Sequence, residues 1–301
     1  MALSDNIKGA ITMSIAMAGF GFNDMLVKTA TKTLATGEII LIRGTISTFL
    51  ILLLALHMGA LRPLKTILHP MLAFRVLGEV TATFTYIYAL SQLPLANAGA
   101  ILQFLPLAVT LGAAIFLGEP VGWRRWGAII AGFVGVLFII KPGPDGFSVA
   151  SFLALGCVFA AAARDIATKR LPEGIPTVYV TLMTSLAVTV GAGIFIQPLG
   201  GWHAPGTMEV TILALSAVCL MVGYLGLITS MRTGEISFIA PFRYTYMIWA
   251  LALSFTVFGD LPDLFMLAGC AIVVASGIYT FYRENRRRTG LPAQSLPRAP
   301  H

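Results

Sequence analysis

The sequence predicts an all-α polytopic membrane protein with ten transmembrane helices, arranged as two inverted five-helix repeats. Three observations predict this fold class: an apolar composition, a regular spacing of apolar segments, and an internal repeat. Of the 301 residues, 57% are hydrophobic and 11% are charged, whereas about 25% of the residues of an average soluble domain are charged. This composition excludes an ordinary soluble enzyme, and it is too apolar for a disordered chain.

Apolar segments of membrane-spanning length recur along the chain. A bilayer core of about 30 Å requires about 20 residues of apolar helix. Such segments lie at 8–29, 37–58, 70–91, 95–117, 121–140, 148–169, 176–197, 208–230, 236–258 and 262–282. The first is expected to remain as a span, because it lacks a convincing signal-peptide cleavage site. The basic and then proline-rich segment 283–301 is predicted to be a disordered cytoplasmic tail.

Lysine and arginine are concentrated on one side of these spans. That side carries Lys8, Arg62, Lys65, Arg124, Arg125, Lys169, Arg170, Arg232, Arg283, Arg286, Arg287 and Arg288, and the other side carries Lys32 and Lys141. The positive-inside rule therefore predicts a multi-pass protein of the bacterial inner membrane with both termini in the cytoplasm. Because the basic residues are scattered singly or in short groups at the ends of spans, no nucleic-acid partner is expected.

A shift of 141 residues aligns the two halves of the chain. The aligned pairs are Asp24 with Asp165, Lys28 with Lys169, Gly118 with Gly259 and Glu119 with Asp260. Because each half has an odd number of helices, the second copy must enter the membrane from the opposite side. Inverted repeats allow two alternative packings, one open to each side, around a central site. We expect a first repeat at 8–140 and a second at 148–282.

These features resemble the drug/metabolite transporter superfamily, specifically its EamA-type members with ten helices. The resemblance is carried by LPLANAGAILQFLPLAVTLGAAIFLGEPVGWRRWGAIIAGFVGVLFI, which includes Pro106 and a G-E-P turn, by its weaker echo ISFIAPFRYTYMIWALALSFTVFGDLP, and by Arg43 in the second span. In the second copy, Met247 stands where Pro106 stands in the first, and no arginine matches Arg43. Within the superfamily the chain is most similar to YddG-type exporters, which implies export of neutral and aromatic amino acids to the periplasm.

Ionisable residues inside the predicted spans are candidates for function, because a charge at the centre of a bilayer costs at least about 2.5–3.5 kcal/mol. The predicted topology places Asp24 and Arg43 in the outer half of neighbouring spans. It places Arg243, with Asp165 or Arg164, in the inner half. We therefore expect two ion pairs, Asp24 with Arg43 and Asp165 with Arg243, each of which is either a gate or a static pair.

Glu79 lies near the middle of the third span, with no partner expected at its depth. It either binds a substrate ammonium group, carries a proton, or forms a hydrogen bond to Thr83. Aromatic rings with polar tips suit the apolar body and polar groups of an amino acid, although packing and lipid contact are their alternative roles. The expected substrate-binding residues are Glu79, Thr83, Tyr86, Gln103, Phe104, Tyr224, Tyr244, Tyr246 and Trp249.

No catalytic motif is evident in the sequence. It contains no G-x-x-x-x-G-K-[ST] or H-E-x-x-H pattern, so we expect no ATP hydrolysis, metal or cofactor. Cys157, Cys219 and Cys270 lack metal-site spacing and are expected to be packing residues. The expected partners are a small-molecule substrate and the lipid bilayer, and the chain is expected to be a monomer, with a dimer as the alternative. An exporter of another metabolite or drug, an enzyme acting on lipid-linked substrates, and a channel stay open as alternative functions.

Overall fold

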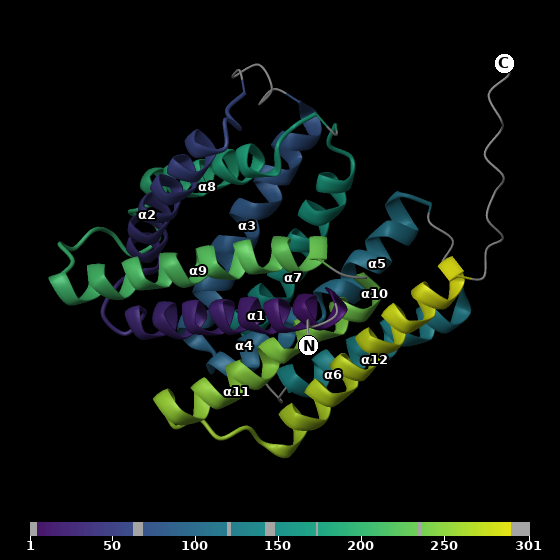
Figure 1. Ribbon diagram of the computed structural model, residues 1–301. Helices are drawn as coiled ribbons and strands as arrows, with labels where there is room; N and C mark the ends of the chain where they lie inside the picture. Colours follow the sequence, from purple (N-terminus) through teal and green to yellow (C-terminus); the bar gives the residue numbers. More distant parts are fainter. Residues whose placement is uncertain are drawn as a thin grey trace, which may run out of the picture.

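The computed structural model describes residues 5–62, 69–118, 122–141, 148–172, 174–233 and 236–289, and these are almost entirely helical (Figure 1). The first half contains α1 (Asp5–Ala30), α2 (Thr36–His57), α3 (Pro70–Gln92), α4 (Leu95–Leu102), α5 (Leu105–Phe116) and α6 (Trp123–Ile140). The second half contains α7 (Val149–Lys169), α8 (Thr177–Ile194), α9 (Thr207–Thr233), α10 (Ile236–Ile239), the 3-10 helix η2 (Ala240–Tyr244), α11 (Thr245–Phe258) and α12 (Leu264–Thr289). The predicted all-α fold is confirmed.

The helix ends fall close to the predicted ones, with one clear difference. Helix α12 continues to Thr289, so the beginning of the predicted disordered tail is helical. The remainder of that tail, Lys65, and the turn residues Glu119 and Pro120 lie outside the described residues.

Eight helical stretches of the described chain are long and apolar enough to cross a membrane. The other two predicted spans are α3 and the unit formed by α10, η2 and α11. Helix α3 contains Arg75 and Glu79 together with several hydroxyl-bearing residues, which lower its hydropathy, and α11 has only 14 residues. Both spans depart from ordinary transmembrane composition or length because they carry polar residues or a break in the helix.

Two spans are broken at equivalent places of the repeat. The fourth span is interrupted at Gln103 and Phe104, between α4 and α5. The ninth is interrupted by η2, and the offset of 141 residues brings Gln103 onto Tyr244. Pro106 follows the first break and Pro241 lies within the second. Proline favours such breaks because it lacks an N–H and clashes with the preceding turn of a helix. Pro241 supplies this effect in the second copy, so the break is retained although Met247 replaces the counterpart of Pro106.

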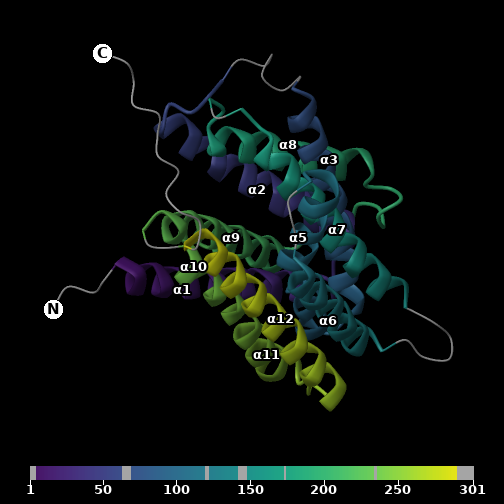
Figure 2. The same ribbon diagram turned by 90° about the vertical axis from the view of Figure 1, so that its right-hand side faces the viewer.

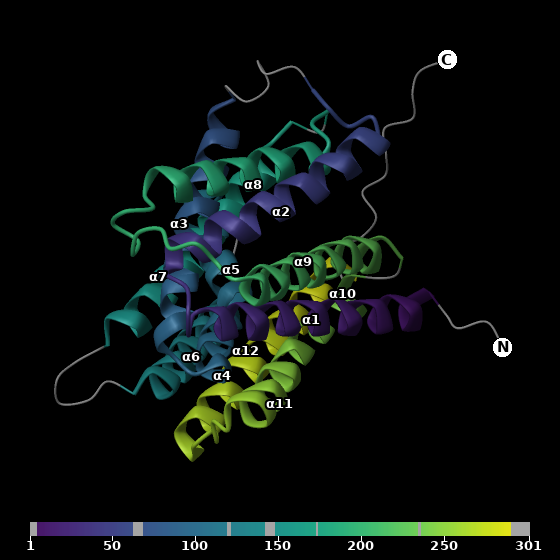
Figure 3. The ribbon, with the colours of Figure 1, turned by 90° about the vertical axis from the view of Figure 1, so that its left-hand side faces the viewer.

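Helices from the two halves interlock. Helix α1 packs against α9 and α11, α2 against α8, α3 against α7, and α6 against α12. Figures 2 and 3 show α2 and α8 side by side at one end of the molecule, with α6 and α12 side by side at the other. Each of these pairs joins a helix of the first half to one of the second, so neither half forms a separate body.

Glycines bring some of these helices into close contact, which is typical of membrane helix packing. A Cβ atom added at Gly19 of α1 would lie 2.9 Å from the carbonyl oxygen of Cys219 on α9. A Cβ added at Gly269 of α12 would lie 2.5 Å from the carbonyl oxygen of Gly135 on α6. Helices α6 and α12 therefore contact each other closely at Gly135 and Gly269.

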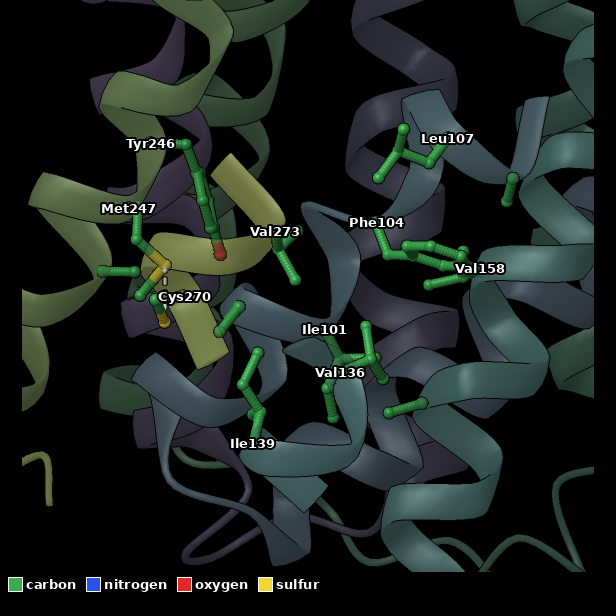
Figure 4. Close-up of a cluster of buried hydrophobic side chains, with 14 of the residues drawn as sticks. Ile101, Phe104, Leu107, Val136, Ile139, Val158, Tyr246, Met247, Cys270 and Val273 are labelled. Atoms are coloured by element: carbon green, nitrogen blue, oxygen red, sulfur yellow. Dashed lines mark hydrogen bonds between the residues drawn. The ribbon is translucent and has the colours of Figure 1, made fainter. Parts of the chain in front are cut away.

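A buried apolar cluster anchors the first break. Figure 4 shows Phe104 and Leu107 among side chains from α4, α6, α7, α11 and α12. The thiol of Cys270 lies 3.9 Å from the sulfur atoms of both Met247 and Met266. This contact gives Cys270 the packing environment that its isolated position in the sequence predicts.

We predict that Gly269→Ala destabilises the protein by about 1–3 kcal/mol, the usual cost of overpacking a tight contact. The added methyl group meets the backbone of α6, which yields less easily than a side chain. Gly127→Ala is the matched control, because nothing lies within 4 Å of its added Cβ. Reversible unfolding in mixed micelles measures both variants, and equal stability of the two would contradict the close packing of α6 on α12.

Candidate functional site

A cavity of about 250 Å³ lies between the two halves of the protein. Its wall is built from α1, α2, α3, the break between α4 and α5, α7, α9, η2 and α11. The ionisable groups of the wall are Asp24, Arg43, Glu79, Arg164, Arg243, Cys157, Tyr86, Tyr224, Tyr244 and Tyr246, and Asn23, Thr83 and Gln103 add neutral polar groups. Apolar residues such as Met17, Phe20 and Leu105 complete the wall. The cavity therefore offers both apolar surface and charge to a solute.

The carboxylate of Asp24 lies at a junction of three helices. Its Oδ2 atom accepts hydrogen bonds from the hydroxyl of Tyr86 on α3, at 2.8 Å, and from that of Tyr246 on α11, at 2.5 Å. Its Oδ1 atom accepts from the amide nitrogen of Asn23 at 2.8 Å. Because an ionised carboxylate only accepts hydrogen bonds, three donors around one buried carboxylate stabilise its charge. The junction also connects helices of both halves.

Asn23 links Asp24 to Arg43. The guanidinium of Arg43 donates to the Asn23 side-chain oxygen at 3.3 Å, and the hydroxyl of Ser216 donates to the same oxygen at 2.8 Å. The expected direct ion pair between Asp24 and Arg43 is thus replaced by a contact through a neutral amide. The reason is local, because Asn23 precedes Asp24 on α1 and occupies the space between the two charged groups.

Glu79 has a partner that the sequence did not reveal. Its Oε2 atom lies 3.0 Å from Nη1 of Arg164, and Nε of Arg164 lies 2.8 Å from Oδ1 of Asp165. The expectation of an unpartnered Glu79 is therefore wrong, and within the described chain its hydrogen bond goes to Arg164 rather than to Thr83. The reason is that α3 packs along α7, which brings Arg164 within reach.

Arg243 does not form the expected ion pair with Asp165. Asp165 bonds instead to the neighbouring Arg164, whose long side chain can turn back to it. Arg243 lines the cavity from η2, and among the described residues no carboxylate lies within 4.0 Å of it. Asp165 is the carboxylate whose charge acts most strongly on it. Among the described residues, the guanidinium of Arg243 thus has no ion-pair partner at the cavity.

The two helix breaks place further polar groups at the cavity. The side-chain nitrogen of Gln103 is buried and has no hydrogen-bond partner in the described part of the chain. The hydroxyl of Tyr244 is also buried without one, but it points to α12, where a Cβ added at Gly277 would overlap it. Gln103 and Tyr244 therefore line the cavity with the remaining parts of their side chains.

A second chamber of about 140 Å³ adjoins the central cavity. The two share Arg43, Glu79, Thr83, Leu220 and Tyr224, and the second is otherwise lined by residues of α2, α3 and α8. The ring of Tyr224 packs edge-on against Phe20, with centroids 5.4 Å apart. The shared residues thus form a polar layer between two chambers.

Arg75 lines this second chamber, and sequence reasoning missed it. Its Nε atom donates to the hydroxyl of Thr168 at 2.9 Å, and its Nη1 donates to the hydroxyl of Thr184. One arginine near the end of a predicted span looks like an ordinary topology signal. Its four-residue spacing from Glu79 places both side chains on one face of α3, and this spacing was the available signal.

Two of the expected substrate-binding residues lie away from the cavity. Phe104 belongs to the buried apolar cluster of Figure 4 and is 1% exposed. Trp249 is 36% exposed and packs against Phe22, with ring centroids 5.8 Å apart. The turn at the break directs Phe104 to the opposite side from Gln103. The buried face of α11 runs through Tyr246 and Ala250, leaving Trp249 at its edge.

Comparison with known proteins places these features in a family context. A sequence model of the EamA-like transporter family matches residues 7–141 and 148–282. The chain is 25% identical over 286 residues to a riboflavin transporter of Vibrio cholerae, covering 93% of this chain and 95% of the relative. It is 27% identical to the pseudopaline exporter CntI of Pseudomonas aeruginosa, covering 91% and 96%. It is 23% identical to an S-adenosylmethionine uptake transporter of Rickettsia bellii, covering 90% and 92%.

A solved structure shares the fold. It is described only as the crystal structure of a protein, and it superposes on 94% of this chain and 99% of its own with a TM-score of 0.64 and 16% sequence identity. At that identity the likeness concerns the fold alone. The three relatives are named for solutes other than amino acids, so the comparisons do not support the YddG-type assignment specifically.

We predict that Tyr246→Phe lowers the free energy of unfolding by about 1.5–3 kcal/mol, as expected for loss of a hydrogen bond to a charged group. In an Asp24→Asn background the same substitution is expected to cost less, because the charged acceptor is already gone. Tyr279→Phe, at an exposed tyrosine of α12, is the control. Reversible unfolding in mixed micelles measures the cycle, and strictly additive effects would exclude the coupling.

Proposed function

The chain belongs to the EamA-like transporter family, and from this premise we propose that it exports amino acids, or small metabolites built on an amino acid, by alternating access. Family membership makes the chain a multi-pass membrane transporter of small metabolites and not an enzyme. The class of solute, the direction of transport and the orientation in the membrane are the proposed parts.

The cavity between the two halves is the observation that carries the proposal. Its volume of about 250 Å³ lies just below the range of about 300–1,000 Å³ typical of pockets for drug-sized ligands. This size favours a solute of amino-acid dimensions. Apolar and aromatic residues suit a side chain, and the charged groups suit an amine and a carboxylate. A site between inverted repeats is the arrangement on which alternating access depends.

The named relatives support a class wider than free amino acids. S-adenosylmethionine, the solute of the Rickettsia bellii relative, contains a methionine moiety with an amine and a carboxylate. The riboflavin transporter relative favours a second candidate, a flat heterocyclic solute held by the aromatic side chains. Riboflavin is larger than an amino acid, so its accommodation requires the central cavity to widen or to join the second chamber.

We predict saturable counterflow in proteoliposomes loaded with unlabelled phenylalanine, threonine or methionine. Labelled amino acid added outside is expected to enter loaded vesicles faster than unloaded ones. The reason is that a carrier that has released unlabelled amino acid outside can return with labelled amino acid bound. Protein-free liposomes are the control, and riboflavin and S-adenosylmethionine are tested in parallel. Flux of either without amino-acid counterflow would replace the amino-acid assignment, and flux that neither saturates nor responds to internal solute would indicate a channel.

The concentration of lysine and arginine on one side of the spans supports cytoplasmic termini. We predict that Ala204→Cys, between α8 and α9, reacts with a membrane-impermeant maleimide applied outside spheroplasts, whereas Met58→Cys, after α2, reacts only after lysis. Both native side chains are exposed, and the test uses a chain whose three native cysteines are replaced by alanine. The reverse pattern of labelling would invert the orientation and, with it, the direction of export.

A further inference from the structure

The wall of the central cavity carries a surplus of positive charge. Its carboxylates are those of Asp24 and Glu79, and its guanidinium groups are those of Arg43, Arg164 and Arg243. With all of these groups ionised, the wall has a formal charge of +1. Arg75 adds a further guanidinium in the adjoining chamber. A cavity with this balance favours a solute group of negative charge, because a buried charge requires a partner.

The contacts within the wall show which charges are already compensated. The Asp24 carboxylate accepts from two tyrosines and Asn23. Glu79 and Arg164 form an ion pair, and Arg164 also binds Asp165. Arg43 donates to the neutral oxygen of Asn23. Arg243 is the cavity guanidinium for which the described residues supply neither an ion pair nor a hydrogen bond to a side chain.

Resting on the proposed transport function, we propose that Arg243 forms a carboxylate subsite within the central cavity, so that transported solutes are small organic acids or zwitterions with a free carboxylate. The guanidinium of Arg243 forms the charge-assisted contact with the carboxylate. The paired Glu79 and Arg164 are then part of the frame rather than ligands of this group. Solutes that lack a carboxylate leave Arg243 uncompensated.

The test compares four probes that share one aromatic body: phenylalanine, 3-phenylpropionate, phenylalaninamide and phenethylamine. Dissociation constants are measured with the purified full-length protein in detergent. We expect the two carboxylates to bind at least about tenfold more tightly than the amide and the amine. Arg243→Gln is expected to weaken 3-phenylpropionate by about tenfold or more, the equivalent of one lost charge-assisted hydrogen bond, and Arg243→Lys is expected to restore part of the affinity.

Arg62→Gln is the matched control, since Arg62 is exposed and donates to the adjacent carbonyl of Leu61. Should Arg243→Gln fail to fold, Arg243→Lys decides the question, because it is expected to bind 3-phenylpropionate more weakly than the wild-type chain. Equal affinities of the four probes, failure of either carboxylate to bind, or unchanged carboxylate binding in the variants would overturn the subsite.

Counterflow separates this outcome from failure of the proposed function. A chain that carries amino acids or S-adenosylmethionine at the same rate with Arg243→Gln as with Arg62→Gln remains a transporter, and only the subsite is overturned. A wild-type chain that binds both carboxylates but shows no counterflow of any solute supports the subsite and removes the proposed transport of amino acids.

Discussion

The cost of taking a charged side chain out of water in the middle of a membrane is the constraint on which the rest of the structure depends. Placing an unpaired charge at the centre of a transmembrane helix costs at least about 2.5–3.5 kcal/mol, so the buried charges of this chain require partners. Asp24 obtains them from α3 and α11, and Glu79 obtains one from α7. Both sets of contacts connect the two halves of the chain. The contacts that compensate the buried charges are thus also contacts that hold the two halves together.

The helix breaks follow from a second constraint, the need to expose polar groups inside a span. A continuous helix satisfies its own backbone and presents only side chains, whereas a break reorients successive residues. At the first break Gln103 faces the cavity and Phe104 faces the apolar core. The second break places Arg243 at the cavity and Tyr244 against Gly277. The apolar cluster of Figure 4 holds the first break in place, which fixes the direction of Gln103.

The sequence predicts the helices well because hydropathy and punctuation by charge, glycine and proline are local properties. It also directs attention to Asp24, Glu79 and Arg243, since charged residues inside apolar segments are conspicuous. Which residue pairs with a buried charge, however, depends on contacts between segments that are distant in the sequence. The pair of Glu79 with Arg164 depends on how α3 packs along α7, which residue order alone does not reveal. Asn23 escaped notice because a neutral amide beside an aspartate carries no comparable signal, yet it separates Asp24 from Arg43.

The two repeats share the arrangement of their helices but not the contacts of equivalent side chains. This difference affects the relative energies of the two packings between which such a carrier alternates. Asp24 and Asp165 occupy equivalent positions, but the first is held by two tyrosines and the second by the adjacent Arg164. Two packings of identical halves would have equal energy, whereas these differing contacts favour one packing over the other. A solute shifts such an equilibrium only by its differential free energy of binding. On the proposed subsite, a carboxylate at Arg243 removes the penalty for enclosing an unpaired guanidinium, so closure of the cavity is favoured when solute is present.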